Sequence, residues 1–173
     1  MLLSDSTCKH VNKIRGMDIY SIPGANIHII HQFIKENSAL LQKYTHLLLH
    51  VGTNDIGNGL SSNLIVQYYN NLLELVHTYC PKIKITISAI LPRPVDFEKT
   101  QNIVIDTNMF LASSSLKRNA LFVKTYKPFV QQPGSLFKKK CFCKDGPVFI
   151  NNLNLSVHLT KIFLRISLAK DKI

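Results

Sequence analysis

The chain has 173 residues, of which 46% are hydrophobic and 18% charged, a composition typical of one globular domain rather than of a disordered chain. Lys and Arg number 21 against 10 Asp and Glu, and the resulting net charge of +11 fits either a solvated basic surface or weak electrostatic binding of RNA or DNA. No apolar run approaches the roughly 18 residues of a membrane span, and the N-terminus lacks the features of a signal peptide. We therefore expect a cytoplasmic or nuclear protein without a membrane span.

The four cysteines form no recognisable metal site. Cys141 and Cys143 make a Cys-x-Cys pair, and no matching Cys/His pair completes a zinc-binding pattern. We interpret these two, together with Cys8 and Cys80, as free thiols in a reducing compartment, with disulfide pairing as the alternative.

Short apolar strands alternate with helical patterns along the chain. Strands are expected at 1–6, 17–24, 45–52, 82–90 and 120–126, and helices at 26–44, 65–79 and 97–117. A loop rich in Gly, Asn and Ser follows the third strand. In the last helix the spacing of Ile105, Met109, Ala112 and Leu116 predicts that these four residues face the core.

This alternation predicts an α/β fold with a parallel sheet and helices on both faces. We expect one domain over residues 1–173; because the chain begins inside its first strand, an N-terminal truncation is left open. In such folds functional groups collect at the carboxyl ends of the strands. Polar and turn residues lie there in four segments, which are Ser4–Ser6, Pro23–Gly24, Gly52–Asp55 and Pro92–Pro94.

Three of these strand ends carry residues that are able to form an oxyanion hole. Ser6 lies where the first strand turns toward a predicted helix; a serine at such a position is a nucleophile or, more often when taken alone, an N-cap. Gly24 follows the second strand and Asn54 follows the third. One N–H group from each of Ser6, Gly24 and Asn54 would make a hole with three donors.

The segments "LLSDST", "IPGANI" and "LLLHVGTNDI" resemble the first three blocks of the SGNH (GDSL-type) hydrolase superfamily. The segment "ISAILPRPVD" and the tail add a closer resemblance, to the esterase domains of animal non-LTR retrotransposon first-open-reading-frame proteins. The likeness covers essentially the whole chain. It departs at Ser4, which replaces the usual glycine of Gly-Asp-Ser.

The resemblance implies a flavodoxin-like three-layer α/β/α sandwich with a five-stranded parallel sheet. It implies hydrolysis of short-chain, acetyl-type esters, with Ser6 as nucleophile, an oxyanion hole from Ser6, Gly24 and Asn54, and no metal or other cofactor. The partner it implies is a small acyl-ester substrate.

In this family the catalytic base is the histidine of a final Asp-x-x-His block, and the present sequence can be aligned with that block in two ways. In the first, His158 is the base and Leu155 occupies the aspartate position. In the second, "FINNLN" matches the segment around the base, so that Phe149 occupies the histidine position and Asp145 lies one residue too far upstream. The second alignment is favoured by an apolar helical stripe that begins before His158, namely Leu155, Leu159, Ile162, Phe163 and Ile166.

If Phe149 occupies the base position, the chain is a catalytically impaired or dead copy of the fold. It would then be a module of retroelement origin that binds nucleic acid or serves assembly.

Two further residues have alternative interpretations. His50 is expected in the core or behind the site, and Arg93 either lines the pocket or forms a loop ion pair.

Overall fold

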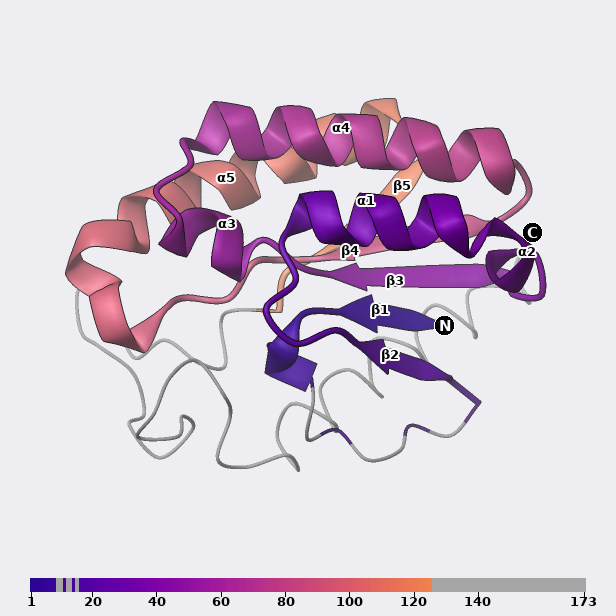
Figure 1. Cartoon of the computed structure of the whole chain (residues 1–173). Helices are drawn as coiled ribbons and strands as arrows, with labels where there is room; N and C mark the ends of the chain where they lie inside the picture. The colour runs from indigo at the N-terminus through magenta and orange to yellow at the C-terminus, as the bar shows by residue number, and fades with distance from the viewer. Residues whose placement is uncertain (9–10, 12–13, 15, 126–173) are drawn as a thin grey trace.

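The computed structural model describes residues 1–8, 11, 14 and 16–125, and the fold below refers to these residues (Figure 1). The strands are β1 (Leu2–Ser4), β2 (Ile19–Ser21), β3 (His46–His50), β4 (Lys84–Ser88) and β5 (Ala120–Val123). The α-helices are α1 (Ile27–Glu36), α2 (Ser38–Leu41), α3 (Thr53–Gly57), α4 (Ser62–Tyr79) and α5 (Phe97–Lys117). Two 3-10 turns, η1 (Ser6–Cys8) and η2 (Pro94–Asp96), complete the described elements.

The five strands form one parallel sheet in the order β2-β1-β3-β4-β5. This is the strand order of flavodoxin-like folds, in which ligands bind at the carboxyl ends of the strands. The predicted α/β class and the five-stranded parallel sheet are confirmed. No described helix is long and apolar enough to cross a membrane.

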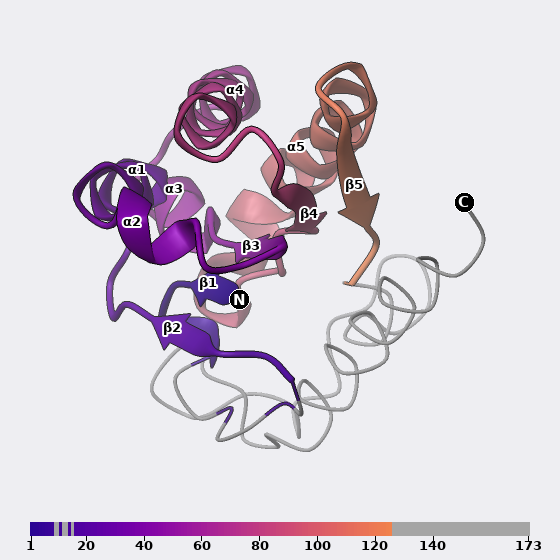
Figure 2. The same ribbon diagram turned by 90° about the vertical axis from the view of Figure 1, so that its right-hand side faces the viewer.

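Helices α1, α4 and α5 cover one face of the sheet, with α4 packed between the other two (Figures 1 and 2). Their buried side chains share a core with strand residues Leu3, Leu49 and Ile87, which point toward them. Tyr69 of α4 is fully buried in this core, and its hydroxyl donates a 2.7 Å hydrogen bond to the Val51 carbonyl, so the one polar atom of the side chain is satisfied.

The helices predicted at 26–44, 65–79 and 97–117 are present, and the structure differs from the prediction at two places between residues 26 and 125. The predicted helix 26–44 is broken at Asn37, whose side-chain amide donates to the Phe33 carbonyl and ends α1. The predicted loop after β3 contains a helix, α3. Cys8 and Cys80 are buried free thiols, as expected, whereas Cys141 and Cys143 lie outside the described residues.

The prediction for the inward face of α5 was wrong. Ile105, Met109 and Leu116 are exposed, and the buried face of the helix contains polar residues, among them Asn108. The Asn108 side chain explains this orientation, because its Oδ1 accepts from the Ile90 N–H at 2.8 Å and its Nδ2 donates to the Ile90 carbonyl at 2.9 Å. Two backbone groups just beyond β4 are satisfied in this way, which apolar side chains could not do.

Candidate active site

Ser6, Gly24 and Asn54 lie beyond the carboxyl ends of β1, β2 and β3, which are neighbours in the sheet. The first residues after β1 and β2 donate backbone hydrogen bonds to the last residues of neighbouring strands, from Asp5 N–H to the His50 carbonyl and from Ile22 N–H to the Ser4 carbonyl. The three residues predicted from the sequence therefore lie at one edge of the sheet.

Ser6 is half-buried at the start of η1. The sequence predicted an α-helix at this point, but η1 is a 3-10 turn of three residues, so any support for a negative charge comes from individual N–H groups rather than from a helix dipole. The turn is held by Asp5, whose Oδ1 accepts from the Thr7 N–H at 2.9 Å and from the Thr7 hydroxyl at 2.6 Å. Within the described part of the chain, the Ser6 N–H makes no hydrogen bond.

Gly24 occupies the third position of a tight turn after β2. The Ala25 N–H donates to the Ile22 carbonyl at 3.1 Å, Pro23 is the second residue, and Gly24 has a φ of 73°. This is the pattern of a type II turn, which needs glycine at that position because φ is positive. Apart from Gly24 and its two chain neighbours, no atom of the described residues lies within 4 Å of the point where a Gly24 Cβ would be, so this part of the chain leaves open space at the site.

Asn54 lies in the first turn of α3, directly beside the turn that contains Gly24. Its Nδ2 donates a 2.8 Å hydrogen bond to the Ala25 carbonyl. A primary amide has two N–H groups, so one remains to donate to a ligand. The neighbouring Asp55 accepts from the Ile27 N–H at 3.0 Å, so two successive residues of α3 hold the segment from Gly24 to the start of α1.

Two buried carboxyls support this site, Asp5 behind Ser6 and Asp55 behind Asn54. Burial raises the pKa of Asp5 to about 6, and the hydrogen bonds from Thr7 and the positive charge of Arg93 only partly oppose that rise. Burial also raises the pKa of Asp55 to about 6, and the negative charge of Asp5 adds to it. Among the described residues, the second oxygen of Asp5 has no hydrogen-bond partner.

Arg93 forms an ion pair and also braces α3. Its Nε donates to the Asp96 carboxylate at 2.9 Å, and its Nη1 donates to the Thr53 carbonyl at 3.0 Å. The guanidinium lies against Gly57, where a Cβ would be 2.5 Å from Cζ. Arg93 therefore fixes the backbone of Thr53, the residue before Asn54, and the absence of a side chain at Gly57 leaves room for the guanidinium.

His50 ends β3 and is buried, as predicted. Its Nδ1 lies 2.8 Å from the Ser88 hydroxyl, which in turn is 3.0 Å from the Thr125 hydroxyl, and Thr125 donates to the Ala89 carbonyl. Burial lowers the pKa of His50 to about 4, so the ring is neutral at pH 7. The two hydroxyls and the ring join the ends of β3 and β4 to the residues after β5.

His158, Phe149 and Leu155, which distinguish the two alignments of the base, lie outside the described residues.

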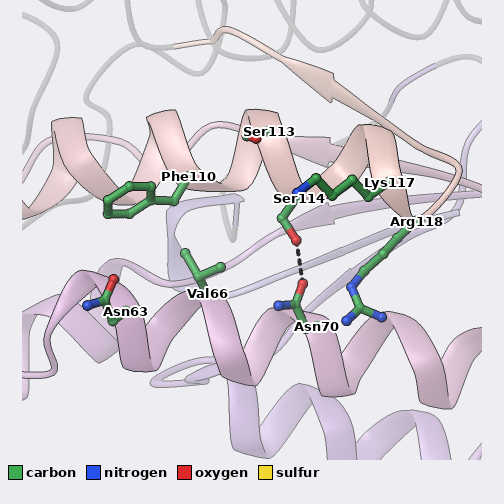
Figure 3. Close-up of a pocket in the computed structure, with 8 residues that line it drawn as sticks. All are labelled: Asn63, Val66, Asn70, Phe110, Ser113, Ser114, Lys117 and Arg118. Carbon is green, nitrogen blue, oxygen red and sulfur yellow. Dashed lines mark hydrogen bonds between the residues drawn. The ribbon is translucent and has the colours of Figure 1, made fainter.

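A groove of about 600 Å³ lies between α4 and α5, away from the predicted site residues. It is lined by Asn63, Val66, Asn70, Phe110, Ser113, Ser114, Lys117 and Arg118 (Figure 3). None of these side chains belongs to the predicted site.

A family model for GDSL-like lipases and acylhydrolases matches residues 4–161, which include all three strand ends. The chain belongs to this family. No curated protein matches the chain.

Solved structures with the same fold cover nearly the whole chain. A member of the lipolytic protein G-D-S-L family from Veillonella parvula is 19% identical, with a TM-score of 0.71 and 95% of each chain covered. An acetyl-xylooligosaccharide esterase from Geobacillus Stearmophilus is 13% identical, with a TM-score of 0.66 over 95% of this chain and 91% of the other. The esterase domain of the ZfL2-1 ORF1 protein from the zebrafish ZfL2-1 retrotransposon also matches, at 23% identity and a TM-score of 0.49 over 95% and 97%.

Sequence reasoning missed the residues that support the family's motifs. Asp5 and Asp55 are part of the matching segments, but their burial and their hydrogen bonds to Thr7 and Ile27 follow only from the packing. For Asn108, the one available signal in the sequence was its helical spacing from the apolar residues Val104 and Leu111.

Proposed function

We propose that this chain is a serine ester hydrolase that cleaves short acyl esters, acetyl esters in particular, with Ser6 as the nucleophile. The observation that carries the proposal is the set of free donors at one edge of the sheet. The N–H groups of Ser6 and Gly24 make no hydrogen bond within the described residues, and Asn54 keeps one amide N–H. The acetyl preference is supported by the acetyl-xylooligosaccharide esterase that shares the fold.

In this mechanism the Ser6 hydroxyl attacks the acyl carbon and the carbonyl oxygen becomes an oxyanion. Hydrogen bonds from Ser6, Gly24 and Asn54 stabilise that charge more than they stabilise the neutral ester, and this difference lowers the barrier. The alcohol then leaves, and water cleaves the acyl-enzyme and regenerates Ser6. A base must take the hydroxyl proton of Ser6; His158 has this role in the first alignment of the last block, whereas the second alignment leaves the chain without a base.

The test is the hydrolysis of a short-chain aryl acetate by the full chain and by its Ser6→Ala variant. We expect the variant to lose at least about a thousandfold in kcat/KM, the order of loss seen when a nucleophilic serine is removed. Ser113→Ala, an exposed serine on α5, is the matched control and should keep full activity. Equal rates for Ser6→Ala and the parent would contradict the proposal.

His158→Ala and Phe149→Ala, measured in the same assay, decide between the two alignments of the last block. If His158 is the base, its removal should lower kcat by about the same factor as Ser6→Ala, because the two residues act as a unit. No activity in the parent chain above the Ser6→Ala background would mean that the base is missing and that Phe149 occupies its position.

A second candidate function, binding of a polyanion such as RNA, is favoured by the distribution of charge. The described residues contain nine Lys and Arg and eight Asp and Glu, so 12 of the 21 basic residues and only two of the ten acidic ones lie in the rest of the sequence. If this charge binds RNA, affinity for a labelled oligonucleotide should fall steeply between about 50 and 200 mM salt. Binding that is absent, or unchanged by salt, would remove this candidate.

A further inference from the structure

An apolar stripe on α5 is exposed although its spacing is that of a packed helix. Ile105 is 55% exposed, Met109 58% and Leu116 80%, and the half-buried Ala112 completes the stripe. Scattered exposed apolar residues are ordinary, but three in line on one helix, with a half-buried alanine between them, indicate an interaction surface.

The stripe lies on the flank of α5 that faces away from α4. At about 100° per residue, Ile105, Met109, Ala112 and Leu116 fall within roughly 60° of one another, next to the buried face. The opposite flank lines the groove toward α4, where Figure 3 shows Phe110, Ser114 and Lys117. Because α4 packs between α1 and α5, the stripe lies at the open end of the helical layer (Figure 2), where a further helix would pack.

The spacing of the stripe identifies the kind of helix that would cover it. The steps from Ile105 to Met109 to Ala112 to Leu116 are four, three and four residues, the repeat of a coiled-coil seam. The seam extends about 16 Å along the helix at 1.5 Å per residue. Ala112, the smallest residue, lies near its middle and allows close approach of a partner helix.

We propose that two copies of this chain pair through α5, with the two helices antiparallel about a two-fold axis near residues 109–112. In this arrangement Ile105 of one copy faces Leu116 of the other, and Met109 faces Ala112. The charges along the helix fit the antiparallel direction. Asp106 and Lys117 are both exposed on the outer side of α5, between the stripe and the groove. Asp106 lies four to five residues before the axis and Lys117 six to seven residues after it, so each Asp106 comes near Lys117 of the other copy.

Only the antiparallel direction uses these charges. In a parallel pair the same flank of the two helices lies on opposite sides of the seam, so Asp106 and Lys117 of the two copies would stay apart. An isologous contact of this kind is also the commonest symmetry of soluble oligomers. The dimer does not depend on the esterase activity, because none of the predicted site residues lies on α5.

The first experiment is sedimentation equilibrium of the full chain up to about 200 μM, since a seam of this length is at the small end of stable interfaces. We expect a reversible monomer–dimer equilibrium, and Leu116→Asp should raise the dimer Kd by at least about a hundredfold because two buried leucines are lost per dimer. Ile29→Asp, at a residue of α1 that is 40% exposed, is the matched control and should leave Kd unchanged. A chain that stays monomeric, or a dimer that Leu116→Asp does not weaken, overturns the proposal.

A charge-exchange experiment tests the direction of the helices. Asp106→Lys and Lys117→Asp should each raise Kd several-fold, and the double variant should return it to near the parent value, because the opposite charges face each other again. Each variant is checked by circular dichroism, so that a change in Kd is not confused with unfolding. A double variant that binds more weakly than either single variant would contradict the antiparallel arrangement.

Discussion

Gly52→Ala should destabilise the protein by about 2–4 kcal/mol and lower esterase activity with it. Gly52 has a φ of 117°, a backbone conformation that costs an L-residue about 1–3 kcal/mol. A Cβ at this position would also lie 2.5 Å from Cδ1 and 3.0 Å from Cγ1 of Ile90, which is buried and has little room to move. Because Asn54 follows two residues later, relief of the contact shifts the oxyanion donor. Urea denaturation and aryl acetate hydrolysis measure the two effects.

Gly59→Ala is the matched control for Gly52→Ala. Gly59 has a φ of 81°, but among the described residues other than its chain neighbours no atom lies within 4 Å of its Cβ position. Gly59→Ala therefore includes the cost of the backbone conformation without a steric contact. Ile90→Val removes Cδ1, the nearer of the two contacting atoms, and should recover part of the stability lost in Gly52→Ala. If Gly52→Ala is no less stable than Gly59→Ala, the close approach of Ile90 does not constrain the turn.

The sheet and the position of the site could be predicted from the sequence because both depend on local patterns. Apolar runs of strand length, separated by helical spacing, allow few topologies other than a parallel sheet. Once the strands are parallel, Ser6, Gly24 and Asn54 must lie at the same edge. Gly24 also has a positive φ, and the Pro-Gly sequence in which it lies is typical of turns that need one.

The orientation of α5 could not be predicted, because the hydrophobic pattern and the hydrogen-bonding needs of the fold disagree there. Periodicity favours Ile105, Met109 and Leu116 as the core face, whereas Asn108 is buried to pair with the backbone of Ile90. An unpaired buried backbone group costs about 1–3 kcal/mol, comparable with the burial of an apolar side chain. Helix α3 was missed for a related reason: its five residues are too few to show a helical period.

Asp5→Asn should remove part of the pH dependence of stability. Burial raises the pKa of Asp5 in the folded protein to about 6 from the usual 3.8, so the folded chain holds a proton that the unfolded chain has lost between those two values. The unfolded state then binds fewer protons, and the contribution of Asp5 to the free energy of unfolding falls as the pH rises from about 4 to 6. A pKa difference of about two between the folded and unfolded states corresponds to about 3 kcal/mol.

We expect the difference in free energy of unfolding between the Asp5→Asn variant and the parent to grow with pH. The introduced asparagine keeps an oxygen that accepts from Thr7 and has no charge to bury. The free energy of unfolding of Asp5→Asn, relative to that of the parent, should therefore rise by about 2–3 kcal/mol between pH 4 and pH 7. His50 has the opposite sign: burial lowers its pKa to about 4, so its contribution is lost as the pH falls below 6.5. That contribution is present in both proteins and cancels in the difference.

Urea denaturation of both proteins at several pH values between 4 and 8 measures this difference. Glu98→Gln, which removes one negative charge from an exposed position on α5, controls for the change in net charge and should show no comparable trend. Because Asp5 also holds the turn that begins at Ser6, Asp5→Asn combines a stability measurement with a functional one. If the variant is more stable at pH 7 and less active, the charge of Asp5 contributes to activity and destabilises the fold. If the difference in free energy of unfolding is constant across pH, Asp5 has the same pKa in the folded and unfolded states, which contradicts the prediction.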